Sequence, residues 1–292
     1  MGFVGAGCST PIGINNFEYS ESLTTHMNKL LLLVTALFFS AWMVEAQDWA
    51  KARLDKSPRH LEWAKVTYGN RTVNAFVGFP EAKDKTTVVI VIHEIFGLSD
   101  WVRGVVDQLA EAGYVAIAPD LLSGTAPGGG GTAELGSGDA VRKAISSLPP
   151  DQITADLNAV AEYAKKLPAS NGKLVVAGFC WGGSETFRYA TNNKDVKAAF
   201  VFYGTGPGKE EDIARITAPV HGFYAENDAR VDATIDKSKE LMQKHAKHYQ
   251  PEIYPGAGHG FMRAGEAPDA SAANKKARDE AWDRWKRLLK GV

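Results

Sequence analysis

One cysteine lies in a pattern typical of enzymes that attack their substrates with a side chain. Cys180 is the centre of residues 178–182, GFCWG, which have the form G-x-S-x-G with cysteine in place of serine. The two glycines permit a turn so sharp that larger side chains there would collide with neighbouring backbone. The helix expected from about residue 182 favours a thiolate through its dipole. The pattern predicts a nucleophilic cysteine; a buried structural cysteine in a glycine-rich turn is the alternative.

A nucleophile in such a turn needs a base, and the base needs an acid that orients it. In this arrangement the acid and the histidine follow the nucleophile in chain order, each after a later strand. Asp228 follows the apolar run at 219–225, and His259 lies within GAGHG at residues 256–260. Because glycines suit a tight loop that delivers an imidazole, we predict Asp228 as the acid and His259 as the base.

The other candidates for these two roles fit less well. Asp232 is the nearest alternative acid, but we expect it to cap the next helix. Among the competing histidines, His245 and His248 lie on an expected helix, His221 lies inside an expected strand, and His60 precedes the first strand.

Cys180, Asp228 and His259 can meet only if the strands that precede them end at the same edge of one sheet. A hairpin is expected from residues 62–68 and 71–79, around Gly69-Asn70. Apolar runs predict further strands, and helical patterns predict helices between them. The strands are expected at 87–93, 114–118, 173–178, 197–203, 220–225 and 252–254, and the helices at 99–112, 151–166, from 182, 232–246 and 271–290. This order predicts an α/β fold, a mostly parallel sheet with helices on both faces.

Local signals set some of the boundaries and loops. Ser99 is expected to cap the helix that begins there, and Gly113 is expected to end it. The glycine-rich stretch at 124–138 lacks the GxxxxGK[ST] and GxGxxG patterns, so we expect a flexible surface loop rather than a phosphate site. The sequon at residues 70–72 is more simply a chance occurrence than a glycosylation site.

Composition excludes several functional classes. The 292 residues are 45% hydrophobic and 23% charged with a formal net charge of −1, which is typical of globular proteins and not of nucleic-acid-binding chains. Cys8 and Cys180 are the only cysteines, too few for a disulfide framework or a multi-cysteine zinc site. The sequence also lacks HExxH. We expect no metal, no cofactor, no nucleic acid and no stable membrane partner.

The first 46 residues have the pattern of an export signal. Residues 30–44 open with an apolar run preceded by Lys29, and small residues follow at 44 and 46. The run is short for a transmembrane helix, and Met27 lies where a signal peptide should begin. The expected division is an extension without fold at 1–26, a signal peptide at 27–46, and one domain at 47–292. The protein is then secreted or periplasmic; an uncleaved membrane anchor is the alternative.

Four motifs together resemble the dienelactone hydrolase family. They are residues 93–98 (HEIFGL), residues 178–183 (GFCWGG), Asp228 with Val231 three residues on, and residues 258–261 (GHGF). The resemblance extends from about residue 62 to residue 290 and rests on the motifs as a set. It implies the α/β-hydrolase fold for the domain at 47–292.

The resemblance also implies roles for individual residues. Cys180, Asp228 and His259 would form a triad that opens an enol-lactone ring through an acyl-thiol intermediate. Glu94 matches a glutamate that helps to form the family's thiolate when substrate binds; a solvent-exposed loop glutamate is the alternative. The oxyanion hole is expected from the backbone N–H groups of Ile95 and Trp181.

Family members hold a substrate carboxylate with two arginines, and only one has a counterpart here. Arg263 matches the first, but no arginine or lysine lies between Arg103 and Arg142, where the second belongs. A carboxylated dienelactone is therefore a less suitable substrate than a neutral ester or lactone. The side chains expected to line the acyl pocket, with core packing as an equal alternative, are Phe96, Trp181, Tyr203 and Phe261.

The sequence thus predicts a secreted hydrolase of small-molecule lactones or carboxylic esters. Its oligomeric state is open, with a monomer favoured. Two alternatives stay open: a general carboxylesterase without dienelactone activity, and a non-catalytic small-ligand-binding protein on the same fold. Three reactive residues at the right loop ends favour the enzyme, because a binding protein has no need of them.

Overall fold

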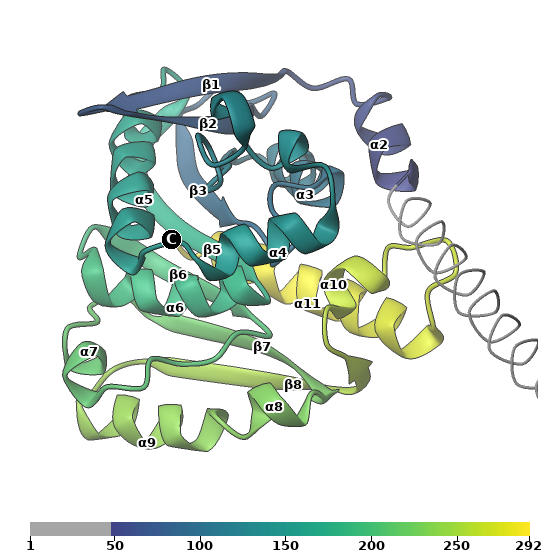
Figure 1. Cartoon of the computed structure of the whole chain (residues 1–292). Helices are drawn as coiled ribbons and strands as arrows, with labels where there is room; N and C mark the ends of the chain where they lie inside the picture. Colours follow the sequence, from purple (N-terminus) through teal and green to yellow (C-terminus); the bar gives the residue numbers. More distant parts are fainter. Residues whose placement is uncertain (1–47) are drawn as a thin grey trace, which may run out of the picture. The chain divides into compact units, whose positions relative to one another are not determined.

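An eight-stranded sheet forms the centre of the computed structural model of the protein, which describes residues 48–292 (Figure 1). Its strands are β1 (Leu61–Tyr68), β2 (Arg71–Gly78), β3 (Thr86–Ile92), β4 (Val115–Pro119), β5 (Ser170–Phe179), β6 (Val196–Phe202), β7 (Val220–Asn227) and β8 (Tyr249–Gly258). Their order is β1-β2-β4-β3-β5-β6-β7-β8. β2 pairs antiparallel with β1 and β4, and the other neighbours are parallel. The predicted hairpin and the mostly parallel sheet are confirmed.

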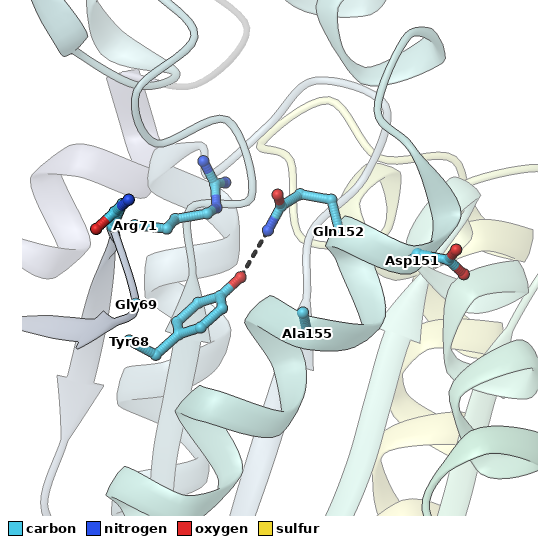
Figure 2. Close-up of a pocket in the computed structure, with 7 residues that line it drawn as sticks. Tyr68, Gly69, Arg71, Asp151, Gln152 and Ala155 are labelled. Carbon is cyan, nitrogen blue, oxygen red and sulfur yellow. Dashed lines mark hydrogen bonds between the residues drawn. The ribbon is translucent and has the colours of Figure 1, made fainter.

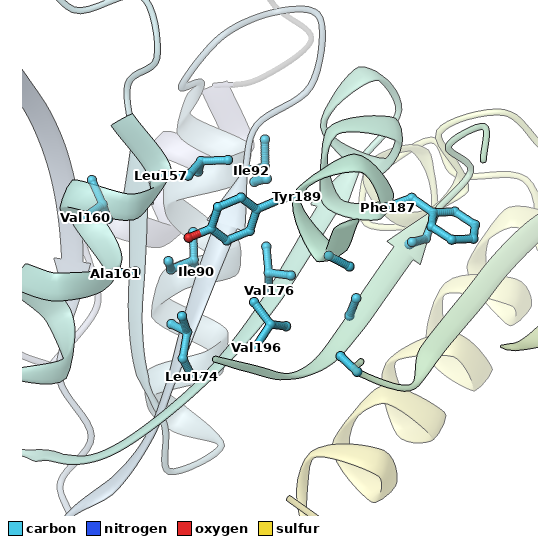
Figure 3. Packing of buried hydrophobic residues seen from close by; sticks show 14 of the residues in the cluster. Ile90, Ile92, Leu157, Val160, Ala161, Leu174, Val176, Phe187, Tyr189 and Val196 are labelled. Carbon is cyan, nitrogen blue, oxygen red and sulfur yellow. The ribbon is translucent and has the colours of Figure 1, made fainter. Parts of the chain in front are cut away.

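The central strands feed two apolar cores, because successive side chains of a strand point to opposite faces. Val88, Ile90 and Ile92 of β3 contact one core, and Val89 and Val91 contact the other. Figure 3 shows part of the first core, where side chains of α5 (Pro150–Lys165) and α6 (Trp181–Asn192) pack on the sheet. On the opposite face α3 (Asp100–Glu111) and α11 (Ala272–Leu289) contribute to the second core. Helices therefore cover both faces, as the sequence predicts.

Shorter helices occupy the connections. They are α2 (Asp48–Leu54), α4 (Gly138–Ser146), α7 (Glu210–Ala214), α8 (Ala229–Asp232), α9 (Ile235–Lys244) and α10 (Phe261–Ala264). The helix predicted near 232–246 is α9, and the short helix α8 that precedes it was not predicted. No helix within residues 48–292 is long and apolar enough to cross a membrane.

Two capping expectations are corrected in detail. Ser99 is the N-cap residue of α3, as predicted, but its hydroxyl group makes no capping hydrogen bond and has no partner among the described residues. Asp232 does not cap α9; its N–H donates to the carbonyl oxygen of Asp228 at 2.9 Å, so it belongs to the turn that Asp228 begins. Thr234 is the residue that precedes α9.

The glycine-rich stretch at 124–138 is tied down at one point. The Asp120 carboxylate accepts hydrogen bonds from the Thr132 N–H (2.8 Å) and hydroxyl group (2.7 Å). The Thr132 hydroxyl oxygen accepts from the Leu98 N–H at 3.1 Å, which joins this stretch to the loop after β3. Gly128 is exposed, whereas Gly131 is buried against Asp120. The stretch is therefore a tethered loop that leads into α4, a helix the sequence analysis did not predict.

The fold brings the predicted site residues to one edge of the sheet. Glu94, Cys180, Asp228 and His259 follow β3, β5, β7 and β8, which run parallel and end at the same edge. The predicted extension at 1–26 and signal peptide at 27–46 lie outside the described residues.

Candidate active site

Cys180 lies in a strained turn between β5 and α6. Its φ of +56° and ψ of −118° are unusual for a residue with a side chain. A Cβ atom at Gly178 would lie 2.2 Å from the Gly182 carbonyl oxygen, and one at Gly182 would lie 2.3 Å from the His93 carbonyl oxygen. Both glycines are therefore required for the close approach that the sequence pattern predicts. This turn holds the half-buried Cys180 thiol at the carboxyl edge of the sheet.

His259 connects Cys180 to Asp228. Its Nε2 atom lies 3.1 Å from Cys180 Sγ, and its Nδ1–H donates to Asp228 Oδ2 at 2.5 Å. The Asp228 side chain is only 6% exposed, whereas the imidazole is 33% exposed. The structure thus brings together the three residues predicted as nucleophile, base and acid, in the order that proton transfer requires.

The surroundings of His259 favour its charged form. The hydrogen bond with Cys180 and the Asp228 carboxylate together raise the pKa of His259 from 6.5 to about 9, against the opposing effect of burial. The imidazolium is therefore stabilised near neutral pH.

We expect Cys180→Ala to lower the pKa of His259 well below its wild-type value of about 9, because the largest cause of the increase is removed. An NMR titration of the His259 Cε1–H in the two proteins measures this. In the wild type, protonation of His259 stabilises the fold fully below about pH 6.5, and this contribution is lost as the pH rises to about 9. Equal titration midpoints in the two proteins would contradict the assigned cause.

Glu94 is buried, not exposed on a loop, and it is paired with Arg263. The guanidinium Nε–H donates to Glu94 Oε2 at 2.8 Å, and the two side chains are 2% and 27% exposed. Burial raises the pKa of Glu94, and the charge of Arg263 opposes this effect. The Arg263 guanidinium also lies 5.2 Å from the centre of the Phe96 ring. In this state Glu94 bonds Arg263, and the Nη atoms of Arg263 make no hydrogen bond to the described residues.

The two backbone groups expected to form the oxyanion hole have no acceptor within the described part of the chain. Ile95 follows Glu94 in a turn, and Trp181 is the first residue of α6. First-turn N–H groups of a helix lack intrahelical partners, so the Trp181 N–H is available to a ligand. Gly182 packs against the carbonyl oxygens of Ile92 and His93, which brings the two segments together.

The four aromatic residues expected to line the acyl pocket divide into two buried and two partly exposed side chains. Tyr203 and Phe261 are fully buried, and their ring centres lie 5.4 Å apart. The Tyr203 ring lies 5.1 Å from the imidazole of His259 in an edge-on arrangement, so it supports the histidine from the core. Phe96 and Trp181 are partly exposed. Core packing therefore accounts for Tyr203 and Phe261.

An apolar cluster lies beside the expected oxyanion hole. The partly buried side chains of Ile95 and Trp181 pack against a small core, to which α4 contributes two members. The buried members of that core are Leu122, Val141 and Ile145. The sequence analysis missed this contribution because α4 carries few apolar residues and follows a glycine-rich stretch. Its position makes this side of the site apolar.

The structure does bring one arginine to the loop after β4, but the arginine is already paired. Arg71 of β2 bonds both carboxylate oxygens of Asp156, at 2.6 and 2.7 Å. Its remaining N–H groups donate to the carbonyl oxygens of Leu121 and Ser123. Arg71 also lines a pocket of about 450 Å³, and Figure 2 shows it there with Tyr68 and Gln152. Arg71 therefore fixes the loop and does not replace the missing second arginine.

Comparison with protein-family models matches residues 73–292 of this chain to the "Dienelactone hydrolase family". A relative from Methylorubrum extorquens named "Putative carboxymethylenebutenolidase" is 32% identical over 77% of this chain and 77% of its own length. A protein of the same name from Escherichia coli K12 is 34% identical over 69% of this chain and 74% of its length.

Solved structures agree with the observed architecture. The crystal structure titled as a "Putative Dienelactone Hydrolase" from Klebsiella pneumoniae has a TM-score of 0.70 at 26% identity and covers 80% of this chain and 99% of that one. An esterase from Pyrobaculum calidifontis has a TM-score of 0.60 at 16% identity, covers 86% of this chain and 92% of its own, and supports the fold alone. The chain has the α/β-hydrolase fold.

Proposed function

This chain belongs to the dienelactone hydrolase family and is a hydrolase, and we propose that it cleaves small lactones or carboxylic esters with Cys180 as the nucleophile. The observation that carries the proposal is the hydrogen-bonded series from Cys180 Sγ through His259 to Asp228. The relatives named as carboxymethylenebutenolidases support a lactone as the substrate class.

The reaction proceeds in two halves. The Cys180 thiolate attacks the carbonyl carbon, and the N–H groups of Ile95 and Trp181 donate to the oxyanion that forms. The His259 imidazolium gives its proton to the leaving oxygen, and an acyl-thiol intermediate results. His259, now neutral, accepts a proton from water, which attacks the thioester. The carboxylic acid leaves, and the thiolate returns to its pair with His259.

The ion pair between Glu94 and Arg263 makes this reaction depend on the charge of the substrate. A substrate carboxylate that binds the free Nη atoms of Arg263 competes with Glu94 for the guanidinium. In molecules where Cys180 still carries its proton, the released Glu94 carboxylate accepts that proton and leaves Cys180 as the thiolate. A neutral substrate leaves the Glu94–Arg263 pair intact and relies on the imidazolium alone.

The same geometry also suits a general carboxylesterase without dienelactone activity. A non-catalytic binding protein is the third candidate, and incubation with p-nitrophenyl acetate separates it from both enzymes. Hydrolysis at a rate that depends on Cys180 supports the proposal, and no release of p-nitrophenol above the buffer rate would contradict it.

We expect neutral lactones to have a higher kcat/KM than matched lactones with a carboxylate. A buried carboxylate needs a cation, and Arg263 already shares its Nε–H with Glu94. Arg263→Ala should lower kcat/KM for the acidic substrate more than for the neutral one. The ratio between the substrates is the useful measure, because loss of Arg263 also leaves the buried Glu94 charge unpaired and reduces stability. A wild-type preference of tenfold or more for the acidic lactone would show that another cation enters the site.

We further propose that the protein is secreted or periplasmic and acts as a monomer. The support is the export pattern of residues 27–46. N-terminal sequencing of exported protein should give Gln47 as the first residue. Recovery of residues 30–44 in a membrane fraction would favour an uncleaved anchor instead.

A further inference from the structure

His93 is a buried histidine that the proposed reaction does not use. It follows β3 directly, precedes Glu94 in the sequence, and has no exposed surface. The sequence analysis gave it no role, although its position next to Glu94 at the end of a buried strand was a usable signal. A polar ring buried at this point requires partners.

The hydrogen bonds of His93 define one tautomer. Nδ1 lies 2.9 Å from the Glu94 carbonyl oxygen, which can only accept, so Nδ1 carries the proton. Nε2 lies 3.4 Å from the Leu121 backbone nitrogen, whose N–H donates to it. Burial lowers the pKa of His93, which agrees with a neutral ring.

The bond to Glu94 fixes the peptide group that carries the Ile95 N–H. The same carbonyl oxygen also accepts from the Gly97 N–H at 3.1 Å, which closes a turn. The peptide bond is trans, so its N–H points opposite to its C=O. With the carbonyl group held by His93 and Gly97, the Ile95 N–H must point away from both of them. Among the described residues it has no acceptor there.

His93 also contacts the second expected oxyanion donor. Its ring stacks on the Trp181 ring, with centres 5.4 Å apart and an interplanar angle of 19°. The His93 carbonyl oxygen lies 2.3 Å from the position that a Cβ atom of Gly182 would take, so α6 begins directly against this residue. One buried residue therefore contacts both peptide segments whose N–H groups face the reaction.

We propose that His93 is a positioning residue for the oxyanion hole: its Nδ1–H holds the Glu94 carbonyl group and thereby aims the Ile95 N–H at the substrate oxygen, while its ring supports Trp181. This inference rests on the proposed function. Because the oxyanion exists only in the transition state and intermediates, His93 affects kcat and has little effect on KM.

Two variants of opposite design test the proposal with p-nitrophenyl acetate. His93→Phe keeps a ring on Trp181 and removes the donor. His93→Asn removes the ring but can place an amide N–H near the position of Nδ1. We expect kcat to fall about 10- to 100-fold in His93→Phe, with KM within about twofold, since removal of a complete oxyanion donor costs about 100- to 1000-fold. His93→Asn should recover most of the loss.

Alkylation of Cys180 by iodoacetamide is the internal control, because that reaction forms no oxyanion. Its rate should be equal in the wild type and both variants. A kcat of His93→Phe within twofold of wild type would overturn the inference. An equal loss in both variants, accompanied by slower alkylation, would also overturn it, since it would assign His93 to packing alone.

The tautomer can be measured without any variant, which covers the case in which His93→Phe fails to fold. Nitrogen-15 NMR of histidine-labelled wild-type protein should show a protonated Nδ1 and an unprotonated Nε2 for His93. A protonated Nε2 would overturn the inference. If instead the wild type shows no Cys180-dependent hydrolysis, the proposed function itself fails, and the two failures are distinguishable.

Discussion

Cys180→Ala should reduce ester hydrolysis by at least about 10³-fold, the scale found when a nucleophile is removed from a triad. The reason is structural as well as chemical. Cys180 is the only cysteine among the described residues, and its Sγ atom lies 3.1 Å from His259 Nε2. The measurement is kcat/KM for p-nitrophenyl acetate with the wild type and the variant.

Cys180→Ser is the matched control, because it keeps a nucleophilic atom at the same position. A hydroxyl group gives up its proton far less readily than a thiol, so the charged pair with His259 does not form at rest. We expect an activity between those of the wild type and Cys180→Ala. In protein that begins at Gln47, and therefore lacks Cys8, iodoacetamide should inactivate the wild type in proportion to labelling and label neither variant. An alanine variant with more than a tenth of the wild-type rate would refute the assignment of Cys180.

The location of the site could be predicted from the sequence because its residues are set by short-range rules. Gly178 and Gly182 mark the turn around Cys180, and His259 lies within its own glycine-rich loop. Parallel strands then carry these loops to one edge whatever the details of packing. The structure places His259 within hydrogen-bonding distance of both Cys180 and Asp228.

Pairings between distant segments could not be predicted in this way. Arg263 is expected to bind substrate, but the sequence did not predict that its Nε–H also bonds Glu94, a residue more than 160 positions earlier. The choice depends on where two loops meet in space, which no local pattern specifies. For Tyr203 and Phe261 the sequence left pocket lining and core packing as equal alternatives for a similar reason, because an aromatic residue after a strand can point into the core or out of it; both are buried. The helix α4 escaped prediction because its two buried residues, Val141 and Ile145, are a weak apolar pattern.

The second large effect is expected from Gly182→Ala, which adds one methyl group at the turn around Cys180. Gly104→Ala in α3 is its matched control. Glycine to alanine within a helix normally stabilises a protein by about 0.5–1 kcal/mol, because alanine loses less backbone freedom on folding. Gly104 in α3 has no atom within 4 Å of the position where a Cβ would lie. Gly104→Ala should therefore raise the free energy of unfolding by about this amount and leave kcat/KM unchanged.

Gly182→Ala is the same chemical change in α6 and should have the opposite effect. Its Cβ would lie 2.3 Å from the His93 carbonyl oxygen and 2.4 Å from that of Ile92, and both are backbone atoms at the end of a buried strand. Since neither can rotate away, α6 must shift, which should lower the free energy of unfolding by about 3 kcal/mol or more. The shift also moves Cys180 and the Trp181 N–H, and a displacement of about 1 Å can reduce the rate about 100-fold. Urea denaturation and kcat/KM of both variants, compared with wild type, measure the two effects. Equal stability of Gly182→Ala and Gly104→Ala would mean that α6 does not begin against β3, and the geometry derived for the oxyanion hole would fail with it.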